Sequence, residues 1–161
     1  HLAILKTFLE SEQKYALILE DDIYIDLSKL NYYRNRIAYI LNNIPSDAQI
    51  VYLSFCWEHC AKLKPYDKKN IFLKSFKPLC RHIYFVSREG ARIIFNNIKN
   101  LKKPGDNTIA YLIEDGKLIS YSVNPEFFIL NQNRQVLGSN LGNSNQYKVC
   151  IKSYKYTNLK K

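Results

Sequence analysis

Three consecutive acidic residues follow an apolar run in the segment YALILEDD, which spans residues 15–22: Glu20, Asp21 and Asp22. The chain as a whole is basic, with 24 Lys and Arg residues against 14 Asp and Glu residues. Adjacent carboxylates repel one another, and a neighbouring buried strand raises the cost of their charge unless a cation or hydrogen-bond donors offset it. The triplet therefore predicts that something positive binds here, and the alternative is an exposed acidic turn.

A second group of reactive residue types lies in the segments CWEHC and CRH: Cys56, His59, Cys60, Cys80 and His82. These residue types suit a structural zinc ion, but their spacing matches no standard zinc module. A disulfide from Cys80 to Cys60 or Cys56 is our first prediction, buried free thiols are the second and zinc is the third. An oxidised pair would indicate a secretory compartment or a particle surface.

Length and composition limit the class of protein that can carry these groups. The 161 residues, 47% of them hydrophobic and 14% aromatic, suit one folded domain and argue against disorder. No apolar run approaches the ~20 residues of a membrane span, so no transmembrane segment is expected. The net charge of +10 favours an anionic partner. We expect a single domain over residues 1–161, with residues 131–161 forming a loop-rich, basic tail.

Hydrophobic periodicity predicts an alternation of helices and strands along the chain. Strand, helix and strand follow one another between residues 15 and 55, which implies a parallel pair with a right-handed crossover. We therefore expect an α/β fold with a mixed, mostly parallel sheet flanked by helices. The expected strands lie in residues 15–19 and in QIVYLSF, IFLKSF, HIYFVS and KLISYSV. The expected helices cover the first dozen residues, a segment from Asp26 or Ser28 to about Asn43, a segment opened by Ser87, and one from Asp106 through Ile113.

Two expectations follow from these elements. The second helix should bury an apolar face made of Leu30, Tyr33, Ile37, Ile40 and Leu41. The acidic triplet should lie at the carboxyl end of a strand, where open α/β sheets bind their ligands. The ligand expected there is a divalent cation that binds a phosphorylated molecule.

Five blocks in this order resemble the glycosyltransferase family 25 domain: LILEDD, YFVSREGARIIF, KKPGD, SVNPEFFILNQ and LGSNLG. That family includes bacterial lipooligosaccharide galactosyltransferases and the domains that glycosylate hydroxylysine in collagen. The resemblance covers nearly the whole chain and implies a GT-A-type fold, a UDP-sugar donor and Mn²⁺ or Mg²⁺. Family members normally have a strand and a helix before the block that begins at His1, so the resemblance implies a domain truncated at its N-terminus.

The resemblance also implies roles for particular residues. Asp22, with Asp21, would bind the metal, and Glu20 or Asp21 would contact the ribose or the sugar. Gln132 and Ser139 would line the donor or acceptor pocket, although Ser139 also suits a loop-closing hydrogen bond.

Asp106, in the PGD turn, is the predicted catalytic base that takes the proton of the acceptor hydroxyl. Its alternative role is the N-cap of the following helix. Glu58, Glu89 and Glu126 are weaker candidates for the base, and Trp57 lies in the irregular loop where acceptor contacts are expected.

The expected function is a metal-dependent transfer of galactose or glucose from a UDP-sugar to the hydroxyl of a glycan or a hydroxylysine-type acceptor. Two other readings stay open. One is a non-catalytic glycan-binding or protein-binding module derived from this fold, and the other is a metal-dependent nuclease. We do not expect nucleic acid as the partner, because a metal-dependent nuclease needs acids from several segments that form two metal sites, and the sequence shows only one clear acidic cluster. A secretory compartment, the cytoplasmic face of a membrane and a viral particle are all compatible with the sequence.

Overall fold

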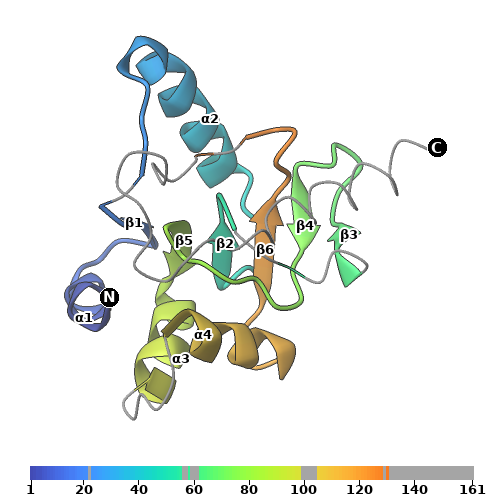
Figure 1. The fold of residues 1–161 in the computed structure, drawn as a ribbon. Helices are drawn as coiled ribbons and strands as arrows, with labels where there is room; N and C mark the ends of the chain where they lie inside the picture. The colour runs from blue at the N-terminus through green and yellow to red at the C-terminus, as the bar shows by residue number, and fades with distance from the viewer. Residues whose placement is uncertain (22, 56–57, 59–61, 99–104, 129, 131–161) are drawn as a thin grey trace, which may run out of the picture.

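The computed structural model describes residues 1–21, 23–55, 58, 62–98, 105–128 and 130. These residues form a six-stranded sheet with helices on both faces (Figure 1). The helices are α1 (Leu2–Glu10), the short 3₁₀ helix η1 (Leu27–Lys29), α2 (Leu30–Asn42), α3 (Arg88–Ile98) and α4 (Gly105–Glu114). The strands are β1 (Tyr15–Leu19), β2 (Ile50–Tyr52), β3 (Lys64–Pro65), β4 (Phe72–Lys74), β5 (Ile83–Ser87) and β6 (Ser120–Val123).

The strand order in the sheet is β1-β5-β2-β6-β4-β3. The prediction of a mixed α/β fold is confirmed, but the prediction of a mostly parallel sheet is wrong. Among the pairings of the described strands, β2 with β6 is parallel and the other four are antiparallel. β1 and β2 do run in the same direction, since both pair antiparallel with β5, but they are not neighbours.

The position of β5 between β1 and β2 follows from its residues. Ile83, Tyr84, Phe85 and Val86 are all buried, so both faces of this strand require cover. A central place in the sheet supplies that cover, whereas β1 is only partly buried over most of its length and lies at the edge. A strand that returns to the centre from far along the chain cannot be placed by local periodicity.

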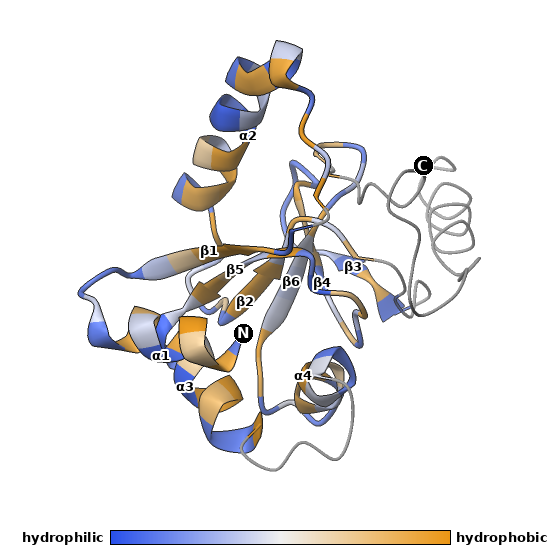
Figure 2. Ribbon diagram, turned by 60° about the vertical axis from the view of Figure 1, so that its left-hand side comes forward, coloured by the Kyte–Doolittle hydropathy of each residue, from blue (hydrophilic) through white to orange (hydrophobic). Residues whose placement is uncertain are grey.

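Two hydrophobic cores lie on opposite faces of the sheet, and neighbouring residues of one strand alternate between them. Tyr84 and Val86 belong to the core beneath α1, α3 and α4, whereas Ile83 and Phe85 belong to the core on the α2 side. Figure 2 shows the central strands coloured as hydrophobic, with α2 on one side and the other three helices on the opposite side.

The helix α2 departs from its predicted packing. It projects away from the sheet (Figure 1), and of its residues only Ile40 is fully buried. Tyr33 and Ile37 are partly buried, as an apolar face requires. Leu30 and Leu41 are 41% and 40% exposed, so their assignment to that face is wrong. The helix meets the rest of the molecule along a narrower stripe than its sequence predicts.

Candidate functional site

The acidic triplet begins where β1 ends. Leu19 pairs with Ile83 of β5, and the backbone N–H of Glu20 donates to the carbonyl oxygen of His82 at 2.8 Å. Glu20 is therefore held at the edge of the sheet where β1 and β2 end and β5 begins. Asp21 is exposed next to it, and Asp22 lies outside the described residues.

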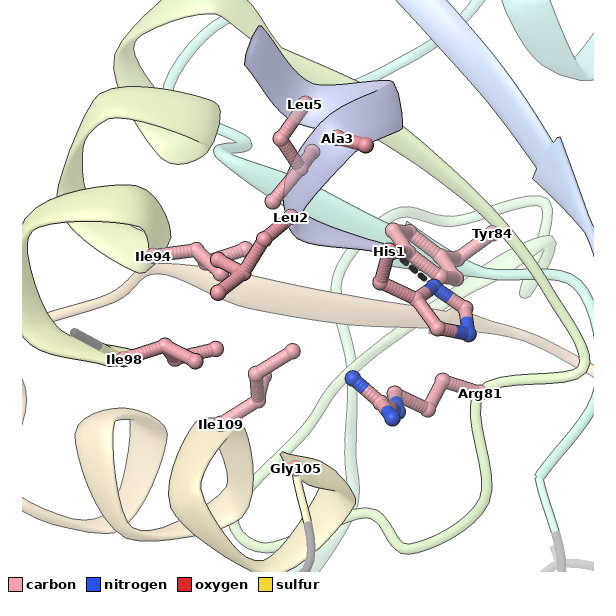
Figure 3. Close-up of a pocket in the computed structure, with 10 residues that line it drawn as sticks. All are labelled: His1, Leu2, Ala3, Leu5, Arg81, Tyr84, Ile94, Ile98, Gly105 and Ile109. Carbon is pink, nitrogen blue, oxygen red and sulfur yellow. Dashed lines mark hydrogen bonds between the residues drawn. The ribbon is translucent and has the colours of Figure 1, made fainter. Parts of the chain in front are cut away.

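The Glu20 carboxylate contacts the start of α1. Its Oε1 atom lies 3.0 Å from Nε2 of His1, and Nδ1 of the same ring lies 3.3 Å from the hydroxyl of Tyr84 (Figure 3). Tyr84 is fully buried, and burial raises the pKa of its phenol to about 12. The charge of Arg81 lowers this pKa by a smaller amount, and the charge of Glu20 raises it. The phenol is therefore protonated at neutral pH, and it fixes the His1 ring beside the acidic triplet.

Arg81 lies close to the start of α4, on the side of the molecule where His1 and Tyr84 are found. Gly105, the first residue of α4, is so close that a Cβ atom there would lie 2.7 Å from Nη1 of Arg81. A side chain at position 105 would require the end of the Arg81 side chain to shift, and this contact brings Arg81 to the residue that directly precedes Asp106.

Two neighbouring buried tyrosines, Tyr52 and Tyr84, have raised pKa values. The rings of Tyr52 and Tyr84 are 6.1 Å apart. Burial raises the pKa of Tyr52 well above its ordinary range, and the charge of Asp106 adds a small further increase. Glu20 acts in the same direction on the pKa of Tyr84. The geometric link between the two predicted groups is one cavity: His1, which contacts Glu20, and Gly105, which precedes Asp106, both line it.

The local geometry of Asp106 differs from the predicted cap. Asp106 lies in the first turn of α4, after the helix has begun at Gly105, so it does not precede the helix as an N-cap residue does. Its Oδ1 atom accepts a hydrogen bond from the N–H of Asn107 at 2.8 Å. The carboxylate is partly buried and held in one orientation at the start of the helix.

The weaker acid candidates lie elsewhere or have another task. The Glu58 side chain is buried and accepts hydrogen bonds from the backbone N–H groups of Phe76 and Lys77, at 3.1 and 2.7 Å. This contact anchors a loop and occupies both carboxylate oxygens. Glu89 and Glu126 are exposed, and Glu89 lies in the first turn of α3, where the helix dipole favours an acid.

A cavity of about 410 Å³ opens beside His1 and Arg81 (Figure 3). Aliphatic side chains from three helices form much of its wall: Leu2 from α1, Ile94 and Ile98 from α3, and Ile109 from α4. Sequence reasoning missed Arg81, His1 and Tyr84 as site residues. The available signal was a charged residue two positions before the largely apolar strand β5.

Cys80 forms a disulfide, which confirms its predicted oxidation, and its partner lies outside the described residues. A cysteine in a disulfide cannot be a zinc ligand, so the zinc reading fails for Cys80. Several predicted residues lie outside the described part of the chain: Cys56, Trp57, His59, Cys60, Gln132 and Ser139.

Within the described ranges, no three His, Cys, Asp or Glu side chains form a group that could hold a metal. The carboxylates of Glu20 and Asp21 have the hard oxygen atoms that Mg²⁺ and Mn²⁺ prefer, and the third acid, Asp22, is not described. The predicted cation stays a prediction, and Glu20 and Asp21 supply the type of ligand atom that it needs.

In comparisons with known proteins, no family model and no curated protein matches the chain. None of the helices in the described segments is both long and apolar enough to span a membrane.

Proposed function

We propose that this chain is a GT-A-type glycosyltransferase domain that transfers a hexose, galactose or glucose, from a UDP-sugar to an acceptor hydroxyl with the help of Mn²⁺ or Mg²⁺. One observation carries the proposal. His1, which contacts Glu20, and Gly105, which directly precedes Asp106, line the same cavity as Arg81 and Tyr84. Sugar transfer of this kind needs a cation, held by acidic residues, at the leaving phosphate and a separate carboxylate as the base at the acceptor.

The residues divide between these two tasks. Asp22 and Asp21 would hold the cation, which neutralises the charge that develops on the departing UDP. Glu20, fixed by His1 at 3.0 Å, would contact the ribose or the sugar. Asp106 would accept the proton of the attacking hydroxyl, and its bond to Asn107 N–H already holds the carboxylate in place.

The sheet supports the GT-A assignment in a limited way. β1, β2 and β6 run in one direction, and the acidic triplet follows the carboxyl end of β1. Ligands of open α/β sheets gather at such ends. A glycan or a hydroxylysine-type side chain is the acceptor class that the family resemblance favours.

Calorimetric titration of UDP with and without MnCl₂ tests the proposal. We expect UDP to bind only with the metal, and Asp22→Ala to abolish that binding while the thermal unfolding temperature is retained. Asp115→Ala is the matched control, because it removes an exposed acid that pairs with Lys117. Equal UDP affinity with and without Mn²⁺, or unchanged affinity in Asp22→Ala, would contradict the proposal. Binding to DNA that weakens with salt would instead favour the nuclease reading.

A further inference from the structure

The cavity beside His1 has walls that sugar transfer does not require. Ile94, Ile98 and Ile109 line this cavity together with Leu2 (Figure 3). The three isoleucines belong to the core and present only a small part of their side chains to the cavity, whereas Leu2 is partly exposed. The volume of about 410 Å³ lies within the range of small-ligand pockets. A water-filled cavity with these walls is unfavourable, so an apolar ligand group would be stabilised there.

The cationic side of the same cavity is Arg81. In the part of the chain that the structure describes, no hydrogen bond or ion pair joins its guanidinium to another residue. The residue is partly buried, and a guanidinium removed from water without a partner is costly. An anionic group bound in the cavity would supply that partner, with paired N–H···O bonds that the planar guanidinium favours.

Two further features favour an anion at this point. The guanidinium lies against Gly105, where the positive end of the α4 dipole adds to its charge. The His1 ring lies on the same side of the cavity, oriented by the Tyr84 hydroxyl. The polar side of the cavity is therefore built from α1, α4 and the residues before β5, opposite the aliphatic wall.

We propose that this cavity binds a small aliphatic anion, an alkyl phosphate or a fatty acid, with its acidic group at Arg81 and its hydrocarbon chain against the isoleucines. A sugar or a nucleobase fits less well, because its polar edges would face aliphatic side chains without hydrogen-bond partners. The cavity shares His1 and Arg81 with the candidate transferase site, but binding there needs neither UDP nor metal and can therefore be measured separately.

Titration of the whole chain with a series of butyl, hexyl and octyl phosphate, without added metal, tests the proposal. Burial of each methylene should tighten binding about fourfold until the cavity is filled. Octanoate in place of octyl phosphate distinguishes a free fatty acid from a lipid phosphate, and either preference supports an aliphatic anion.

Two variants and one control locate the site. Arg81→Gln should weaken octyl phosphate binding by at least about tenfold, the effect of losing a charge-assisted hydrogen bond. Leu2→Asn places a polar group in the wall at a partly exposed position and should remove the dependence on chain length. Arg92→Gln changes an exposed arginine of α3 that does not line the cavity, and it should bind as the wild type does.

Three results would overturn the proposal. Inorganic phosphate that binds as tightly as octyl phosphate would leave no role for the aliphatic wall. Unchanged binding in Arg81→Gln would remove the anion site. UMP that displaces octyl phosphate at equal concentration would assign the cavity to a nucleotide. Failure of Mn²⁺-dependent UDP binding would affect none of these measurements, so the two proposals fail separately.

Discussion

The Nε2 atom of His1 lies 3.0 Å from Oε1 of Glu20, and this contact joins the start of α1 to the end of β1. Both side chains are partly exposed, at 23% and 31%, so the pair lies at the surface of the site rather than inside the core. One carboxylate oxygen is thereby committed to a protein partner. Glu20 is consequently better suited to orient a ligand than to be the principal metal ligand, a role that remains with Asp22 in our proposal.

Glu20→Gln separates the charge of this residue from its hydrogen bond. The amide oxygen can still accept from His1, but the negative charge is lost. We expect Mn²⁺-dependent UDP affinity to fall about tenfold, as it does when a group next to a metal ligand is altered. Glu10→Gln is the control, because it removes an exposed acid on α1 that pairs with Lys6. Calorimetric affinities equal to the wild-type value would restrict Glu20 to a structural role.

Asp106→Asn tests the proposed role of Asp106 as the catalytic base. The Asn side chain keeps an oxygen that can accept from Asn107 N–H, so α4 should remain intact and UDP binding should barely change. Turnover should fall by roughly 10² to 10⁴, because an amide cannot take the acceptor proton. The assay measures sugar transfer to a glycan or hydroxylysine acceptor. Near-normal transfer by this variant would leave Asp106 with a helix-start role alone.

The secondary structure could be predicted closely where the signal is local. The strand Tyr15–Leu19 is predicted to the residue, because its apolar run is bounded by Lys14 and by the acidic triplet. Ser87 is correctly placed before α3, and its hydroxyl accepts from the N–H of Gly90 at 3.1 Å. In each case the residues that decide the structure are neighbours along the chain.

The sheet order and half of the site could not be predicted, because they depend on contacts between distant residues. The pairing of Tyr15 with Ser87 places β5 beside β1, and no periodicity encodes it. In the sequence, Arg81 lies between Cys80 and His82, and nothing there distinguishes it from an ordinary exposed charged residue. Only its close approach to Gly105 places it in the cavity.

Cys80 is predicted to be more tolerant of glycine than of alanine. Its φ of +65° lies in the left-handed region, which glycine adopts without strain and alanine adopts at a cost of about 1 kcal/mol. Both variants lose the disulfide, whose contribution is on the order of 3 kcal/mol. Urea unfolding should therefore rank the free energy of unfolding as wild type, then Cys80→Gly, then Cys80→Ala. Equal stability of the two variants would contradict the backbone argument.

The oxidation of Cys80 can be measured directly on the same preparations. Alkylation of the unreduced, denatured protein should leave Cys80 unmodified, and peptide mapping should identify which other cysteine is joined to it. Cys56 and Cys60 are the partners predicted from the sequence. Alkylation of all four cysteines without a reductant would show that the bond does not form in the isolated protein.

The buried phenol of Tyr84 should make stability fall at alkaline pH. Its pKa is about 12 in the folded chain against an ordinary value of 10.0, so the folded state retains a proton that the unfolded state releases. This contribution is fully present below pH 10, and it is lost as pH rises through about 12, to a total of about 2 to 3 kcal/mol. The raised pKa of Tyr52 acts in the same direction.

Tyr84→Phe isolates this effect. The variant loses the hydroxyl contact to His1, which should cost about 1 kcal/mol at pH 8, but it has no proton to release at position 84. Its free energy of unfolding, measured in urea between pH 9 and 12, should therefore fall less steeply than that of the wild type. Tyr24→Phe, which removes the hydroxyl of an exposed tyrosine, is the matched control. Parallel pH profiles for wild type and Tyr84→Phe would show that the phenol ionises freely in the folded chain, and that the ring is not sealed beneath His1 and α1.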